Sequence, residues 1–148
     1  LIDPVPLEVD GTDENGLPYG IGRVGELSGG PMSVQAFAQR AKDGLQLGGI
    51  RAMDAEVPVQ KVAVGGGACG EYIPQALAQG CDTFVTSDLR YNDFLDTQGL
   101  NLIDAGHFPT EDPVCAKIVA YLEKEFPQLT IIKSTSHKEV IQYFVEGE

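Results

Sequence analysis

The sequence predicts an α/β fold, with a mostly parallel or mixed sheet flanked by helices. Short runs of apolar and β-branched residues alternate with segments whose apolar residues recur at helical spacing. Glycine, proline or clusters of polar residues separate most of these segments. Strands that alternate with short helices favour a sheet with many parallel neighbours, and such sheets bind ligands at the carboxyl ends of their strands.

The expected strands are short and rich in Val, Ile, Leu or Thr: 21–27, 50–53, 61–64, 82–86, 100–104, 129–133 and 140–145. The expected helices carry apolar residues every three or four positions: 34–45, 71–79, 89–97 and 112–126. Ser33 is suited to cap the first helix, and Gly48-Gly49 stops that pattern. Gly80 closes the second helix, and Pro127 ends the last one.

Composition narrows the class of protein. The 148 residues suit one domain, and no apolar run is long enough to cross a membrane. The formal charge of -12 repels nucleic acid and anionic lipid, and the Lys and Arg residues form no basic patch, so we expect neither partner. Three widely spaced cysteines in apolar context favour reduced thiols in a cytoplasmic protein.

Residues 1–18 differ in composition from the remainder of the chain. They are rich in Pro, Asp and Gly, as inter-element linkers are, and the chain begins with Leu. We therefore predict that residues 1–18 are a linker or the remnant of an insertion. We also expect the chain to be a fragment of a longer protein.

The segment 106–111, Gly-His-Phe-Pro-Thr-Glu, is the strongest functional feature. His107 and Glu111 are four residues apart after an expected strand, so one helical turn places them on the same face. An imidazole and a carboxylate together are typical ligands of a divalent metal ion. The alternative is that His107 and Thr110 only cap the helix while Glu111 interacts with its dipole.

A glycine cluster, 65–70, suggests a competing function. It satisfies G-x-G-x-x-G between an expected strand and helix, and Asp88 follows the next strand, as in dinucleotide-binding domains. The same glycines would also permit a tight turn that binds no ligand. Cys69 lies at the expected helix start, where a lowered pKa would make it reactive, although a structural cysteine is the alternative.

Polar residues gather again in the segment 86–93, directly after an expected buried strand. They indicate either the wall of a site or a short helix with an Asp N-cap and a surface pair between Arg90 and Asp93. His137 lies in a polar connection without a second ligand nearby, so we interpret it as a surface histidine.

Four segments in this order resemble the C-terminal half of the NIF-three-like dinuclear metal proteins, also called type 2 homologues of GTP cyclohydrolase I: 19–27, the glycine cluster after 61–64, 86–93 and 101–111. The resemblance covers 19–148 and implies one half of a two-lobed NIF-three-like fold. It also implies a toroidal homohexamer. The family often has a histidine where this chain has Asn92.

The resemblance implies a centre of two divalent metal ions per full-length subunit, as zinc, manganese, iron or nickel. His107 and Glu111 match two of its ligands, whereas a pair of adjacent histidines and an aspartate come from the other half. This chain has no adjacent histidines. We expect a metal-binding protein, and a cytoplasmic metal-dependent hydrolase of a nucleotide-like molecule or phosphoester. The alternatives are a non-enzymatic metal-binding scaffold and a dinucleotide-binding domain. No catalytic residue is identified.

Overall fold

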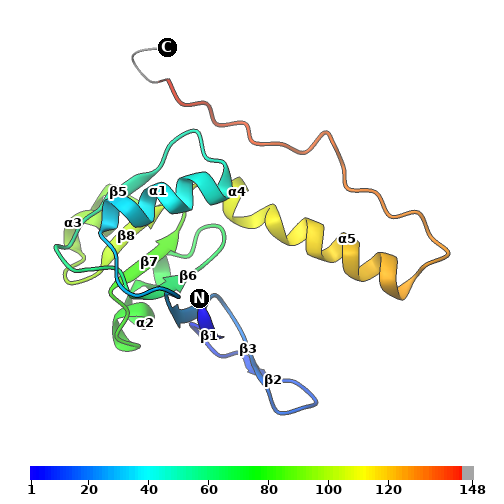
Figure 1. Cartoon of the computed structure of the whole chain (residues 1–148), viewed down its shortest axis with the longest axis horizontal. Helices are drawn as coiled ribbons and strands as arrows, with labels where there is room; N and C mark the ends of the chain where they lie inside the picture. Colours follow the sequence, from blue (N-terminus) through cyan, green and yellow to red (C-terminus); the bar gives the residue numbers. More distant parts are fainter. Residues whose placement is uncertain (145–148) are drawn as a thin grey trace.

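The computed structural model describes residues 1–144 and is organised around a six-stranded mixed sheet (Figure 1). The strand order is β1-β4-β6-β7-β8-β5. The strands β6 (Lys61–Val64), β7 (Thr83–Thr86) and β8 (Asn101–Asp104) are parallel. The outer strands β1 (Ile2–Val5), β4 (Arg23–Glu26) and β5 (Arg51–Met53) are antiparallel to their neighbours. The predicted α/β fold with a mixed sheet is therefore confirmed.

Successive side chains of a strand point to opposite sides of the sheet. In the central strands both sides are buried. Val62, Val85 and Ile103 belong to the core on one face, where helix α1 (Val34–Leu45) packs. The core on the other face contains Ala63, Phe84 and Leu102. Helix α2 (Ile73–Ala78) packs there through Ala76, and α3 (Tyr91–Asp96) packs through Phe94. This double burial explains why the two middle residues of each central strand are both apolar.

The four predicted helices are present, with shifts at their ends. Ser33 caps α1 as expected, since its Oγ accepts a hydrogen bond from the Ala36 N–H at 3.2 Å. The helix ends with Gln46 in a left-handed conformation, before the glycines that were expected to stop it. A 3₁₀ turn, η1 (Gly70–Tyr72), precedes α2. The last expected helix is α5 (Pro113–Glu125), preceded by the short α4 (His107–Glu111).

Residues 1–18 contain short strands, and their role as a linker or the remnant of an insertion stays a prediction. They contain β1, which pairs with β4 in the main sheet, and β2 (Gly11–Thr12), which pairs with β3 (Pro18–Tyr19) in a small hairpin. Leu7 is buried in the core. Every residue of β1 is exposed, so this edge strand tolerates polar residues and proline and lacks the apolar pattern of an inner strand. The domain boundary at residue 19 stays a prediction.

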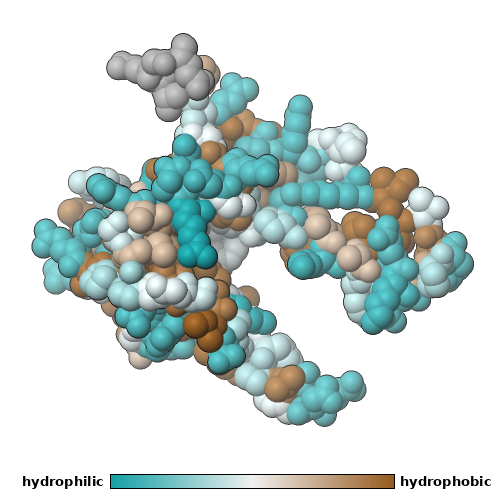
Figure 2. Space-filling model, in the orientation of Figure 1, coloured by the Kyte–Doolittle hydropathy of each residue, from teal (hydrophilic) through white to brown (hydrophobic). Residues whose placement is uncertain are grey.

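The chain after α4 departs from the compact body. Figure 1 shows α5 extending away from the sheet, and no residue of α5 is buried. Figure 2 shows hydrophobic residues among hydrophilic ones on the surface of this arm. The strand prediction for 129–133 is wrong, and so is that for 140–144, because neither segment pairs with another strand among residues 1–144. Residue 145 of the second segment lies outside the described residues.

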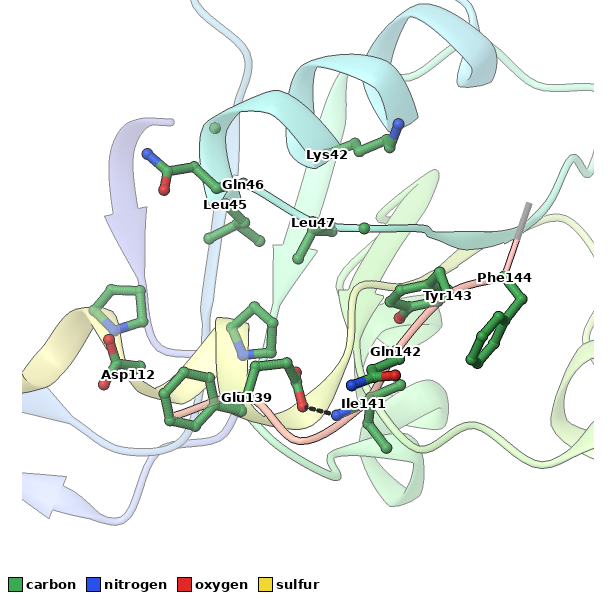
Figure 3. A pocket seen from close by; sticks show the side chains of 15 residues that line it. Lys42, Leu45, Gln46, Leu47, Asp112, Glu139, Ile141, Gln142, Tyr143 and Phe144 are labelled. Carbon is green, nitrogen blue, oxygen red and sulfur yellow. Dashed lines mark hydrogen bonds between the residues drawn. The ribbon is translucent and has the colours of Figure 1, made fainter. Parts of the chain in front are cut away.

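The segment after α5 returns to the body beside the end of α1 (Figure 3). There Tyr143 packs on Gly48 and Gly49, where an added Cβ would lie 2.6 and 2.5 Å from the tyrosine ring. Glu139 Oε1 accepts a hydrogen bond from the Ile141 N–H at 2.8 Å. The two glycines thus let the returning segment pass close to the backbone. No helix within residues 1–144 is long and apolar enough to cross a membrane.

Candidate metal centre

Three loops meet at one edge of the sheet, where the parallel strands β6, β7 and β8 end. They are the glycine loop that follows β6, the Ser87-Asp88 turn that follows β7, and the Gly106-His107 turn that opens α4. The carboxyl ends of parallel strands meet at the same edge, which is the expected place for a ligand site in such sheets. The two candidate metal ligands and Asp88 are thereby brought together.

His107 contacts a carboxylate on each side of its ring. Its Nδ1 lies 2.6 Å from Asp88 Oδ2, and its Nε2 lies 3.2 Å from Glu111 Oε2. The three side chains are about half exposed. Since a carboxylate is only an acceptor, Nδ1 donates its proton to Asp88 and leaves Nε2 directed at Glu111. The predicted pairing of His107 with Glu111 on one helical face is confirmed.

This donor set fits a divalent cation. The Nε2 nitrogen and the Glu111 carboxylate would be the ligands, while Asp88 on the opposite ring nitrogen would fix the tautomer and the orientation of His107. Asp88 contacts the Nδ1 side of the ring, whereas Glu111 contacts the Nε2 side. Accordingly, residues 1–144 contain no group of three or more His, Cys, Asp or Glu side chains arranged to hold an ion.

The electrostatics of the pair favour a cation. The hydrogen bond to Asp88 is the largest effect and raises the pKa of His107 above its ordinary value. Partial desolvation lowers that pKa, and the charge of Glu111 raises it again. Both carboxylates therefore stabilise positive charge on the imidazole. A metal ion at Nε2 would experience the same field.

The glycine loop packs directly against the two candidate ligands. The Gly67 N–H donates to Thr110 Oγ1 at 2.9 Å, which joins the loop to α4. Gly67 has φ +69°, and an added Cβ would lie 2.3 Å from Glu111 Oε1 and 3.3 Å from His107 Nε2. Glycine is required here by both its conformation and its small size. The loop leaves room beside Glu111 that any other residue would fill.

The capping alternative does not describe this helix end. Gly106 is the N-cap of α4, and no side chain caps the helix there. The Thr110 hydroxyl accepts from the Gly67 N–H, and its one proton lies within reach of the carbonyls of Gly106 at 2.8 Å and His107 at 2.9 Å. The His107 ring is used by Asp88 and Glu111. The His107 side chain therefore contacts Asp88 and Glu111 and does not cap the helix.

The dinucleotide alternative is not supported by the loop geometry. A pyrophosphate needs free backbone N–H groups at the loop and helix start. Here the Gly67 N–H is bound to Thr110, and the Cys69 N–H donates to Thr86 Oγ1 at 3.0 Å. The helix that follows has only six residues and begins after η1. These two backbone N–H groups are thus bound within the protein and are not free for a pyrophosphate.

Cys69 does not have the lowered pKa expected of a reactive thiol. Burial raises the pKa of its thiol, and this effect exceeds the lowering caused by the hydrogen bond with Thr86. The nearby charges of Glu71 and Glu111 raise it further. Cys69 is therefore better described as a structural cysteine than as a reactive thiol.

The contact of Asp88 with His107, and the residues that hold Asp88 in place, were not predicted from the sequence. Asp88 adopts a left-handed conformation with φ 56°, which is uncommon for a residue with a side chain. Buried Asp104 accepts hydrogen bonds from the N–H groups of Leu89 at 3.0 Å and Gly106 at 3.1 Å. Those are the residues next to Asp88 and His107. Asp104 therefore joins the two turns that carry the pair.

The remaining candidates lie outside this contact. Arg90 and Asp93 form the predicted pair, with Nη2 to Oδ1 at 2.8 Å, and Arg90 is the N-cap residue of α3 in place of the expected Asp. Asn92 is exposed on α3. His137 is exposed as predicted, and its ring packs against Phe108 with centroids 5.1 Å apart.

The fold and this edge define an α/β protein with a histidine and glutamate pair at its strand ends. A family model for Duf34/NIF3 (NGG1p interacting factor 3) matches residues 5–139, and the chain belongs to this family. It is 37% identical over 109 residues to a GTP cyclohydrolase 1 type 2 homolog of Bacillus subtilis, and 38% identical over 125 residues to one of Streptomyces coelicolor. The resemblance found in the sequence is confirmed.

The relatives are longer than this chain. The matches cover 72% and 80% of the chain but only 29% of the Bacillus subtilis relative and 43% of the Streptomyces coelicolor relative. A solved structure of a Bacillus cereus protein related to NIF3 superposes with a TM-score of 0.74 at 30% identity. That superposition covers 87% of this chain and 37% of the other. The chain thus spans less than half the length of these relatives.

Proposed function

We propose that this chain supplies His107 and Glu111 to a divalent metal centre, which is completed by ligands from outside the chain. The observation that carries the proposal is the pair formed by His107 Nε2 and Glu111 Oε2 at 3.2 Å, with Asp88 on the other ring nitrogen. This is the carboxylate, histidine and metal arrangement that fixes a ligating imidazole. Two ligands bind an ion weakly, so further ligands are needed.

In the complete protein we propose a centre of two divalent ions that serves hydrolysis of a small nucleotide-like molecule or phosphoester. A metal ion there would lower the pKa of a bound water and polarise the bond to be cleaved. Glu111 acts as a ligand in this scheme, while Asp88 keeps His107 oriented. Gly67 keeps the adjoining space open. The centre belongs to a cytoplasmic homohexamer in this proposal.

The test is the metal content of the intact protein and of its variants. After dialysis against a mixture of divalent metals, inductively coupled plasma mass spectrometry should find bound metal that His107→Ala and Glu111→Ala each reduce. Glu123→Ala is the matched control, because Glu123 is exposed on α5 and lies outside the pair. Metal content that is the same in all three variants and the wild type would refute the proposal.

Activity separates the hydrolase from a metal-binding scaffold. Metal-dependent turnover of nucleotides or phosphoesters that disappears in Glu111→Ala would support hydrolysis. Bound metal without turnover across a broad panel would favour the scaffold. Asp88→Asn should weaken metal binding by about ten- to a hundredfold, because it removes the carboxylate that orients His107.

A further inference from the structure

A cavity of about 740 Å³ adjoins the metal site and is not used by the proposed function. It is lined by Asp88 and His107, by Arg51 of β5, by Phe108, and by residues of the returning C-terminal segment. His107 and Arg51 thus line the same cavity, so one small ligand could contact both. A hollow of this size is suited to a small organic molecule.

Arg51 presents a guanidinium that is held in place yet open to the cavity. Its Nη2 donates to the Leu89 carbonyl at 2.9 Å and also contacts the Asp104 carboxylate. The guanidinium lies over the Phe94 ring, 5.3 Å from its centroid, while 59% of the Arg51 side chain is exposed. Within residues 1–144, neither Nε nor Nη1 has an acceptor. A fixed guanidinium with free N–H groups is a preorganised site for an oxyanion.

The carboxylates around the cavity are already engaged. Asp104 is bound to Arg51 and to two backbone N–H groups. Asp88 is bound to His107, and Glu139 Oε1 accepts the N–H groups of the two residues that follow it, at 2.7 and 2.8 Å. The cationic group of Arg51 keeps free donors. An anion in the cavity would therefore be recognised by these free N–H groups, although Asp88, Asp104 and Glu139 also line the cavity.

The lining of the cavity also contains a second cation and apolar side chains. Lys138 lines the cavity, is exposed, and has no ion pair within residues 1–144. Phe108 and Tyr143 line the cavity with Val140 and Ile141. Aromatic and aliphatic side chains accept the apolar body of a ligand, while the cations bind its charged end.

We propose that this cavity binds an anionic organic ligand whose phosphate or carboxylate group is held by Arg51, next to the His107 and Glu111 pair. Lys138 contributes to the attraction, and the body of the ligand lies against Phe108 and Tyr143. The position of the anion beside a metal ion rests on the proposed function. The recognition by Arg51 does not, because it depends only on contacts in this chain.

The experiment measures binding to the intact protein by isothermal titration calorimetry with three probes: phenylphosphonate, benzoate and neutral benzyl alcohol. We expect the preferred anion to bind at least tenfold more tightly than benzyl alcohol. The comparison of the two anions identifies phosphate or carboxylate as the preferred group. Arg51→Lys should weaken binding of that anion by about ten- to a hundredfold, because lysine keeps the charge but loses the planar fork.

Further variants test whether the effect is specific to the cavity. Arg40→Lys and Lys117→Ala change exposed residues outside the cavity and should leave anion binding unchanged. Lys138→Ala should weaken binding by roughly two- to fivefold. The Lys138→Ala variant also tests the cavity proposal if Arg51→Lys fails to fold, because Lys138 lies on the exposed returning segment.

The possible outcomes separate this inference from the metal proposal. Anion binding that depends on Arg51 or Lys138, with normal metal content, supports both. Anion binding of this kind in a protein without metal supports the cavity and overturns the metal proposal. Absence of binding for both anions, or unchanged affinity in both Arg51→Lys and Lys138→Ala, would overturn the cavity proposal whatever the metal content.

Discussion

The sheet and the C-terminal arm differ in how deeply their residues are buried. We define the arm as α5 with residues 126–144. Every residue of β7 and β8 is buried, whereas no residue of α5 is. Apolar residues of α5 are exposed at Val114, Ile118 and Tyr121. The strands depend on contacts with distant parts of the chain. The arm depends mainly on local helix formation and a few contacts, such as the 2.6 Å pair between Lys133 and Asp112.

The difference matters for function because each region contributes to the site in its own way. The sheet fixes His107, Asp88 and Glu111 through the ends of buried strands. The arm supplies only one lining of the neighbouring cavity, through residues such as Lys138 and Tyr143. We therefore expect substitutions in the sheet to change stability, and substitutions in the arm to leave it nearly unchanged.

The largest effect is expected in the core of the sheet. Phe84 is fully buried on β7, so Phe84→Ala should lower the free energy of unfolding by about 3–5 kcal/mol through the lost packing and the cavity left behind. Tyr121→Ala removes an aromatic residue that is 62% exposed on α5 and should change it by less than about 0.5 kcal/mol. Urea unfolding of the intact protein measures both. Similar losses would mean that the arm is covered in the intact protein.

A smaller loss is expected at the residue that joins the two site turns. Asp104→Asn replaces one acceptor of a buried carboxylate that receives the N–H groups of Leu89 and Gly106, and should destabilise the protein by roughly 1–3 kcal/mol. Asp88→Asn is the comparison, because Asp88 is half exposed and its loss should affect metal binding far more than stability. Equal stability of the two variants would contradict the role given to Asp104.

Much of the fold could be predicted because its central strands carry an unmistakable local pattern. The runs that became β6, β7 and β8 are short, have two apolar residues at their centre, and are bounded by glycine or polar residues. The edge strand β1 was missed because an exposed edge has no apolar pattern. The segments 129–133 and 140–144 were wrongly predicted as strands, because apolar composition does not reveal whether a pairing partner exists.

The candidate site could be predicted only where it is local in sequence. His107 and Glu111 lie one helical turn apart, so spacing places them together. Asp88 reaches His107 because Thr86 and Asp104 are register partners on adjacent parallel strands. Arg51 is likewise the cross-strand partner of Asp104. Such pairings join residues distant in the chain, and neither composition nor periodicity specifies their register.

Replacing glycine with alanine should have opposite effects on stability in the glycine loop and in helix α1. Gly67→Ala forces a left-handed residue to carry a Cβ next to Glu111, so it should destabilise by about 1–2 kcal/mol and weaken metal binding. Gly44→Ala on α1 meets no atom within 4 Å and should stabilise by roughly 0.5–1 kcal/mol, since glycine is unfavourable in a helix. Thermal unfolding and metal titration of both variants measure this. Stabilisation by Gly67→Ala would refute the close-packed loop.

The smallest effect is expected at the start of α3, and it depends on pH. The Asp93 carboxylate accepts hydrogen bonds from the Arg90 side chain and from its backbone N–H at 2.7 Å. The side-chain bonds are the largest cause that lowers the pKa of Asp93 in the folded protein. Asp93→Asn should therefore lower the free energy of unfolding at neutral pH, by about 1 kcal/mol or less, as for a lost helix cap.

The sign of the pH dependence follows from the lowered pKa. The stabilisation is fully present above the ordinary pKa of an aspartate, about 4, and is lost as the pH falls through the lower pKa of the folded state. The difference between the wild type and Asp93→Asn should thus be constant near neutrality and shrink below about pH 4. Urea unfolding at several pH values measures it. Asp96→Asn removes a charge from the other end of α3 and controls for the change in net charge. A difference that grows toward acid pH would contradict the assignment, because protonation of Asp93 weakens the Arg90 contact that the wild type has and the variant lacks.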